Sequence, residues 1–210
     1  MEHKLFDRIE LESFAHNGNR YYILPKSGVA VPSVTTVLYK DTEFSDHPAL
    51  RKAARRGTDV HDLCEQYLKT HEVPKKMMPS DKAIFDKIKK VIDEHVTEIN
   101  LIEGCVYSKQ LMTAGKVDLL CKWDDKSAVV DFKTSKRHKK ETDLQNYCDQ
   151  IICYGLLSMR CYNTFKPKNC YIVLANDDDP EAQVFKFEFT WTRAQRVVDI
   201  YYSSRHDHHN

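Results

Sequence analysis

Two short apolar runs joined by a polar turn constrain this sequence more than any other stretch. Val117 to Trp123 and Ala128 to Phe132 are rich in β-branched and aromatic residues, and Asp124-Asp125-Lys126 lies between them. This pattern is typical of a β-hairpin. If Asp124 and Asp125 form a two-residue loop, the residues of the two arms pair in order outward from the turn. The sequence therefore predicts an antiparallel hairpin of known register.

That register brings three polar side chains to one face. Asp118 is opposite Asp131, with Cβ atoms about 4.5–5.5 Å apart, and Lys133 shares the face of Asp131. Facing aspartates repel unless a cation lies between them, and a hard divalent metal would remove the repulsion. The alternative is an ordinary solvent-exposed face, because Asp and Lys are common on surfaces. The other face is expected to be core and carries Val117, Leu119, Cys121, Ala128, Val130 and Phe132.

Composition places the chain among globular proteins. Its 210 residues are 41% hydrophobic and 30% charged, which suits one domain with a sizeable core. No apolar run approaches the length of a membrane span, and the first residues lack a signal-peptide core. Seven cysteines without paired short spacings are typical of reduced thiols in an intracellular protein. The expected location is the cytoplasm of a bacterial or phage-infected host, or the mitochondrion.

The net charge of +1 hides two basic runs. Such runs are usually solvated, but beside an acidic centre they favour contacts with a polyanion backbone. The residues expected to contact nucleic acid are Arg51, Lys52, Arg55 and Arg56 before the hairpin, and Lys136, Arg137, Lys139 and Lys140 after it.

Helix and strand signals order the rest of the chain. Short strands with turns at Asn17-Gly18-Asn19 and at residues 25–28 precede a helix capped by Ser33. A second helix is predicted from Pro48 to about Thr70, with Asp46 or His47 near its cap. Ser80 is expected to cap a third helix whose apolar stripe is core. That stripe comprises Ile84, Phe85, Ile88, Val91, Ile92, Val96 and Ile99.

Strands and helices alternate in the second half. Strands are predicted at 101–108, 110–122, 127–133, 169–175 and 183–189, with a helix at about 143–159 between the third and fourth. Thr190 or Thr192 is expected to cap a last helix. Within the 143–159 helix, Gln150 and Tyr154 are one turn apart.

Two further residues bear on a metal site. His61 and Glu65 are four residues apart on one helix face, which indicates either a simple helical pair or a histidine lowered onto the hairpin. Glu103 is expected on the strand beside the hairpin. A lone Glu is normally a surface residue, but here its carboxylate would supply additional oxygen ligands.

Five patches in this order resemble the PD-(D/E)xK nuclease superfamily, and within it the RecB-like branch. The greatest similarity is to the mitochondrial genome maintenance exonuclease and related phage exonucleases. Val117 stands where the superfamily's name places Pro. The patches span residues 32–154 and are Pro32 to Leu38, Arg56 to His61 with Glu65, Gly115 to Asp118, Asp131 to Thr134, and Gln150 to Tyr154.

The resemblance implies an α/β fold, a restriction-endonuclease-like core sheet flanked by helices with an N-terminal strand and helical elaboration. It implies one or two Mg²⁺ or Mn²⁺ ions and no iron–sulfur cluster, since the cluster cysteines of some relatives are absent. Lys133 would be the active-site lysine, and Gln150 and Tyr154 would line the site. The implied metal-contacting residues are His61, Glu103, Asp118, Asp131 and the Phe132 carbonyl.

The resulting hypothesis is one nuclease domain over residues 1–210, with a helical elaboration at 33–100 and a catalytic core at 101–175. It would hydrolyse DNA as an exonuclease, with single-stranded ends preferred, and would have no membrane partner. The alternatives are a structure-specific endonuclease of the same fold and a nucleic-acid-binding module without catalysis. The second alternative has no need of Asp118, Asp131 and Lys133 together.

Overall fold

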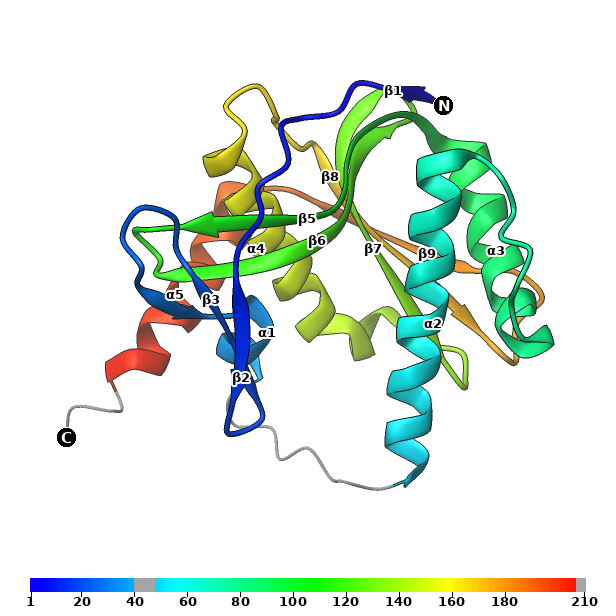
Figure 1. Cartoon of the computed structure of the whole chain (residues 1–210), viewed down its shortest axis with the longest axis horizontal. Helices are drawn as coiled ribbons and strands as arrows, with labels where there is room; N and C mark the ends of the chain where they lie inside the picture. Colours follow the sequence, from blue (N-terminus) through cyan, green and yellow to red (C-terminus); the bar gives the residue numbers. More distant parts are fainter. Residues whose placement is uncertain (40–47, 207–210) are drawn as a thin grey trace.

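A six-stranded mixed sheet forms the centre of the computed structural model, which describes residues 1–39 and 48–206. Its order is β1-β5-β6-β7-β8-β9, and a smaller sheet of order β2-β3-β4 lies beside it (Figure 1). The predicted α/β class, a core sheet flanked by helices with an N-terminal strand and helical elaboration, is confirmed. The strands are β1 (Glu2–His3), β2 (Ser13–His16), β3 (Asn19–Ile23), β4 (Ala30–Pro32), β5 (Val96–Ser108), β6 (Thr113–Trp123), β7 (Lys126–Ser135), β8 (Asn169–Asn176) and β9 (Gln183–Glu188).

Helices cover both faces of the large sheet. One face packs against α2 and α3, and the other packs against α1, α4 and α5. The crossover from β7 to the parallel strand β8 runs through the 3₁₀ turn and α4. The helices are α1 (Val34–Leu38), α2 (Pro48–Thr70), α3 (Pro79–His95), α4 (Gln145–Cys161) and α5 (Trp191–His206), with the 3₁₀ turn at Glu141–Leu144.

The predicted hairpin forms in the predicted register from the turn as far as Leu119 and Val130, but the predicted pairing of Asp118 with Asp131 was wrong, because the ladder ends one pair earlier. Cys121 pairs with Ala128 and Leu119 pairs with Val130. Asp124 and Asp125 form the loop with φ values of 47° and 64°. Positive φ at both loop residues matches the right-handed twist of the two strands. Asp tolerates this conformation better than most residues, which explains how the turn forms without glycine.

The hairpin strands separate where the acidic residues begin. The β6–β7 ladder ends at Leu119 and Val130. Beyond that point β6 continues beside β5, whereas β7 continues beside β8 as far as Ser135. The two strands thus form a fork, and Asp118 lies where they diverge.

Parts of α1 and α4 fill the fork. A Cβ atom added to Gly115 would lie 2.5 Å from the Tyr154 ring, so glycine is needed for this approach. Thr113 Oγ1 donates a hydrogen bond of 2.9 Å to the Pro32 carbonyl, which joins β6 to the segment before α1. The fork is therefore a packed junction of strands and helices from both halves of the chain.

Side-chain alternation is interrupted at the fork. Leu119 and Cys121 pack toward α2 and α3, as predicted, together with Phe132. Val117, expected on that same face, belongs instead to the cluster around α4. The prediction for Val117 was wrong because strict period-two alternation requires an unbroken ladder, and the β6–β7 ladder ends before residue 118.

The helix starts test three capping predictions. Ser33 accepts a hydrogen bond from the Thr36 amide and caps α1, as predicted. Thr190 accepts one from the Arg193 amide at 3.3 Å before α5, which favours Thr190 over Thr192. The prediction for Ser80 was wrong, because Met78 is the N-cap of α3 and Pro79 occupies its first position. The predicted cap at residues 46–47 lies outside the described residues.

The boundary between the third helix and the first core strand also differs from the prediction. The apolar stripe predicted for the third helix includes Val96 and Ile99. The helix α3 ends at His95, however, and both residues belong to β5. Both side chains are buried in the α2–α3 cluster. Core residues at the end of a helix and at the start of the next strand face the same interior, so the stripe continued past the helix end.

All seven cysteines are free. Over the two described ranges, no helix combines the length and apolar character that crossing a membrane requires.

We expect Gly115→Ala to lower the free energy of unfolding by about 1–3 kcal/mol, because the new methyl group overpacks against Tyr154. In a Tyr154→Ala background the same change should cost much less, and chemical denaturation of the four proteins measures the difference. Gly57→Ala is the matched control. Its Cβ would meet only Thr134 Oγ1 at 3.7 Å, so it should be neutral or stabilising within helix α2. Equal costs in both Tyr154 backgrounds would contradict the assigned contact.

Candidate metal centre

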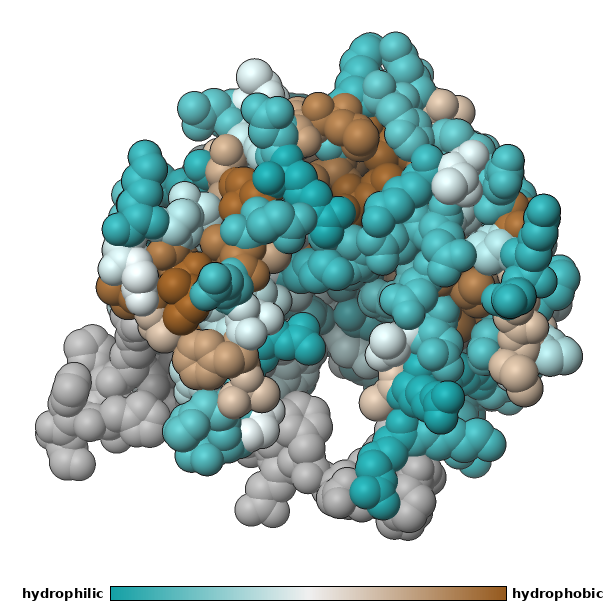
Figure 2. Space-filling view, in the orientation of Figure 1, coloured by the Kyte–Doolittle hydropathy of each residue, from teal (hydrophilic) through white to brown (hydrophobic). Residues whose placement is uncertain are grey.

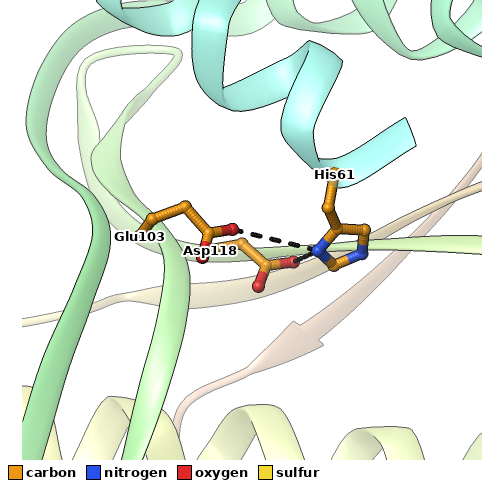
Figure 3. Close-up of side chains that lie close together, drawn as sticks. All are labelled: His61, Glu103 and Asp118. Atoms are coloured by element: carbon orange, nitrogen blue, oxygen red, sulfur yellow. Dashed lines mark ion pairs between the residues drawn. The ribbon is translucent and has the colours of Figure 1, made fainter. Parts of the chain in front are cut away.

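His61 projects from α2 onto the fork. Its Nε2 atom lies 2.6 Å from the Phe132 carbonyl oxygen. A carbonyl only accepts hydrogen bonds, so Nε2 carries the proton and donates it. In the neutral ring the lone pair is then on Nδ1, which lies 3.5 Å from Asp118 Oδ2 and 3.9 Å from Glu103 Oε1 (Figure 3). The β7 backbone therefore orients the imidazole toward the two carboxylates.

The two carboxylates come from facing positions on β5 and β6. Ile102 pairs with Leu119 and Gly104 with Val117, whereas the intervening residues Glu103 and Asp118 do not pair. Glu103 has a φ of 49°, an unusual conformation for a non-glycine residue. This local break directs both side chains toward His61 (Figure 3).

Asp118 also connects the two arms of the fork. Its Oδ2 atom accepts a hydrogen bond of 2.8 Å from the Phe132 amide. The Asp118 side chain thus satisfies a β7 backbone N–H group that lies beyond the last pair of the β6–β7 ladder. The same β7 residue, Phe132, contacts Asp118 through its N–H and His61 through its C=O.

Burial and neighbouring charges shift the pKa values of the three clustered side chains in opposite directions. Burial raises the pKa of the Asp118 carboxyl to about 7. Burial would lower the pKa of His61, but the attraction of Asp118 and Glu103 outweighs it and raises that pKa to about 9. Burial would likewise raise the pKa of Glu103, yet the neighbouring His61 and Lys116 lower it. Without a metal, a protonated His61 therefore neutralises part of the acidic charge.

Lys133 and Asp131 form a second pair on β7. Lys133 Nζ lies 2.6 Å from Asp131 Oδ2, and Asp131 is 2% exposed. Burial opposes the lysine charge, but Asp131 and Asp118 outweigh this and raise the pKa of Lys133 above its ordinary value. The ammonium also lies 5.3 Å from the centre of the Tyr147 ring, in a cation–π contact. Lys133 is thus charged and held in place.

Gln150 and Tyr154 meet on α4 as their spacing predicts. Gln150 Nε2 donates to the Tyr154 hydroxyl at 3.2 Å, and both side chains are buried. Burial raises the pKa of Tyr154 well above its ordinary value, so this residue stays neutral. The pair lies in the fork, where the Tyr154 ring packs against Gly115.

A metal ion fits the donor set of His61, Glu103 and Asp118. One ligand atom from each residue lies within 4.8 Å of the others. Carboxylate oxygens are ligands for hard divalent cations, and an imidazole nitrogen is a ligand for transition metals, so the set suits a divalent metal ion. The buried Asp118 carboxylate, whose charge is unfavourable without a cation, supports this fit.

The structure brings together some of the predicted site residues and separates others. His61, Glu103 and Asp118 cluster, whereas Asp131 is not part of that cluster and contacts Lys133. The Phe132 carbonyl contacts His61. The roles of Asp131 and Phe132 as metal ligands therefore stay predictions.

Glu65 does not form the helical pair with His61 that the spacing allowed. Its Oε1 atom lies 2.6 Å from Lys69 Nζ, one turn further along α2. His61 instead contacts β5, β6 and β7, as the second interpretation of the His61–Glu65 spacing required.

The two predicted basic runs meet near the end of β7. An acidic turn after β8, formed by Asp177, Asp178 and Asp179, lies between them. Arg56 forms a two-pronged ion pair with Asp177, at 2.6 and 2.8 Å. Lys136 also acts electrostatically on Asp177, and Arg55 lies 3.9 Å from Asp59. The exposed members of the predicted set are Arg51, Lys52, Arg55, Lys136, Arg137 and Lys140, with Arg56 and Lys139 half-buried.

Comparisons with known proteins add little. No protein-family model matches the sequence, and no curated protein matches it. An alkaline exonuclease structure from Laribacter hongkongensis shares 11% identity at a TM-score of 0.44, covering 83% of this chain and 86% of that one. A structure from Eubacterium rectale, described as that of an exonuclease candidate, shares 9% identity at a TM-score of 0.41, covering 80% and 73%. Both scores are below 0.5, so neither likeness contributes to the conclusions below.

Sequence reasoning missed two residues of this region. Lys116 Nζ lies 2.7 Å from Glu103 Oε2, and Tyr147 contacts Lys133. A signal for Lys116 was present, because period-two alternation places it on the face of Asp118. Tyr147 carried no such signal, since its contact depends on how α4 packs against β7.

Replacing His61 with Ala should raise the Mn²⁺ concentration required for half-maximal activity by about tenfold or more, because one donor of the cluster is lost. Metal titration of the hydrolysis rate measures this. Glu65→Ala is the control, as that carboxylate contacts Lys69, and its metal requirement should match the wild type. A His61→Ala enzyme with the normal rate and normal metal requirement would reduce His61 to a helix-face residue.

Proposed function

We propose that this protein is a metal-dependent deoxyribonuclease that hydrolyses phosphodiester bonds as an exonuclease. The observation that carries the proposal is the cluster of His61, Glu103 and Asp118, in which Asp118 is buried and the other two are half-buried, beside the charged Lys133–Asp131 pair. A binding module gains nothing from gathering three carboxylates with a histidine and a lysine. Membership of the RecB-like branch is part of this proposal and depends on the sequence motifs.

His61, Glu103 and Asp118 would hold Mg²⁺ or Mn²⁺, with Asp131 as a further carboxylate. When bound, such a metal lowers the pKa of water and stabilises charge on the departing oxygen. The protein itself supplies orientation and charge. Phe132 fixes the ring of His61 through its carbonyl and fixes Asp118 through its amide. Lys133 presents a permanent positive charge beside Asp131, suited to a phosphate that gains negative charge during hydrolysis.

Substrate access favours a strand with a free end. Figure 2 shows the surface hollowed between α2 and the region of the small sheet. A cavity of about 350 Å³ lies between β3 and α1, lined by polar groups that include Arg20, Thr36 and Tyr39. Tyr39, at one edge of this cavity, lies within electrostatic range of Lys133 and Asp131, which supports this cavity as part of the route to the proposed site. A single strand with flexible bases suits such a route better than a rigid duplex.

Replacing Asp118 or Asp131 with Asn, or Lys133 with Ala, should each reduce hydrolysis by at least about a hundredfold, because each removes a charge from the reacting centre. Asp118→Asn should keep or raise the melting temperature in EDTA, since a buried carboxylate with a raised pKa is replaced by a neutral amide. Rates and thermal melts check both points. Full activity of Asp131→Asn would remove Asp131 from the assigned site.

Linear single-stranded DNA should be degraded, whereas closed single-stranded circles of the same sequence should resist. End-labelled linear and circular substrates, incubated with Mg²⁺ and with Mn²⁺, measure this difference. Rapid cutting of circles would favour the structure-specific endonuclease. Tight binding of DNA without hydrolysis under either metal would favour the binding module.

Hydrolysis of linear DNA should depend steeply on salt and weakly on sequence, because backbone phosphates are contacted without base readout. Lys136→Ala and Lys140→Ala should each reduce the salt dependence of binding by about one counterion. Arg56→Ala should change it less, because that guanidinium is occupied by Asp177. An equal effect of all three variants would place Arg56 in the DNA-binding surface as well.

A further inference from the structure

The Glu103 carboxylate is shared between two partners. Its Oε1 atom lies on the side of His61, 3.9 Å from Nδ1, while its Oε2 atom lies 2.7 Å from Lys116 Nζ. One oxygen is therefore directed into the metal centre, and the other is held by an ammonium group. No role was assigned to Lys116 by the sequence motifs.

Strand register explains why these two residues meet. Lys116 pairs with Cys105 across the β5–β6 ladder, so Glu103 is its diagonal neighbour on the same face. Lys116 is the exposed residue of an otherwise buried or half-buried strand. Its ammonium group, charged at neutral pH as lysine ordinarily is, lies between Glu103 and solvent.

The backbone conformation of Glu103 is unusual for a strand residue. Its φ of 49° lies in the left-handed region, which a non-glycine residue adopts at a cost. It also lies at the one position between Ile102 and Gly104 that lacks a β6 partner. The unpaired backbone turns this side chain toward His61, and the contact with Lys116 holds the carboxylate in that position.

We infer that Lys116 is a positioning residue for the metal centre. Its ammonium holds Glu103 Oε2, and Oε1 is thereby presented to the ion beside His61 and Asp118. Ligand carboxylates are commonly oriented by such outer contacts, and removing one weakens metal binding by about 10- to 100-fold. This inference rests on the proposed metal-dependent function and concerns the same site.

The test is Mn²⁺ binding by isothermal titration calorimetry, without DNA. The Lys116→Met protein should bind Mn²⁺ about 10- to 100-fold more weakly than the wild type, and Lys116→Arg should recover most of the affinity because guanidinium also donates to a carboxylate. The His61→Ala protein identifies any Mn²⁺ that binds elsewhere on the chain.

Lys122→Met is the matched control. Lys122 forms an ion pair of 3.1 Å with Glu98 across the same two strands, and its side chain is 38% exposed, compared with 41% for Lys116. Both variants remove one Lys–Glu pair, so thermal melts in EDTA should show similar small changes. Only Lys116→Met should lose metal affinity.

The possible outcomes are distinct. Unchanged Mn²⁺ affinity in Lys116→Met would overturn the positioning role while leaving the metal centre in place. Tighter binding would also overturn it, since Lys116 would then be a cation that competes with the metal for Glu103. A wild-type protein that binds no Mn²⁺ would overturn the metal centre itself and the proposed function with it.

Discussion

The separation of β6 from β7 determines the geometry of the whole site. Where two antiparallel strands are paired, the N–H and C=O groups that face the partner strand are used within the ladder and are not available to side chains. After Leu119 and Val130 the ladder ends, and the amide and carbonyl of Phe132 become free. Asp118 accepts from the amide and His61 donates to the carbonyl. Three elements are thus joined through one peptide segment.

Charge explains why the surrounding groups are arranged in pairs. Buried carboxylates are unfavourable unless cations or hydrogen bonds compensate them. In the described residues, Asp131 is compensated by Lys133, Glu103 by Lys116, and Asp118 by His61 and the Phe132 amide. Of these cations, His61 is the group that would give up its Nδ1 proton to a binding metal and offer a lone pair in its place. The lysines keep their charge and hold their carboxylates in place.

The sequence predicted the parts of the site that depend on local patterns. The hairpin register followed from two apolar arms and a two-residue loop, and the contact between Gln150 and Tyr154 followed from helix periodicity. The partner of Asp118 did not follow, because it depends on β5. Extending the hairpin register pointed to Asp131, whereas the carboxylate that clusters with Asp118 is Glu103. A ladder break cannot be seen in the alternation of one strand.

The acidic turn after β8 contacts basic side chains from three parts of the chain. Asp177 occupies the guanidinium of Arg56, Lys87 donates to the carbonyls of Asn176 and Asp179, and His138 contacts the Asp179 carboxylate at 2.8 Å. These contacts join α2, α3 and the segment after β7 on one side of the fork. The positive charge of these basic side chains is largely compensated, so the side chains attract a polyanion weakly. Exposed cations that are not paired with this turn follow β7 directly, at Lys136, Arg137 and Lys140, and others lie at the start of α2, at Lys52 and Arg55. Under the proposed function, a nucleic-acid backbone would therefore be drawn to the C-terminal end of β7, the strand that carries Lys133. The contacts of the acidic turn fix α2 and hence hold His61 over Glu103 and Asp118.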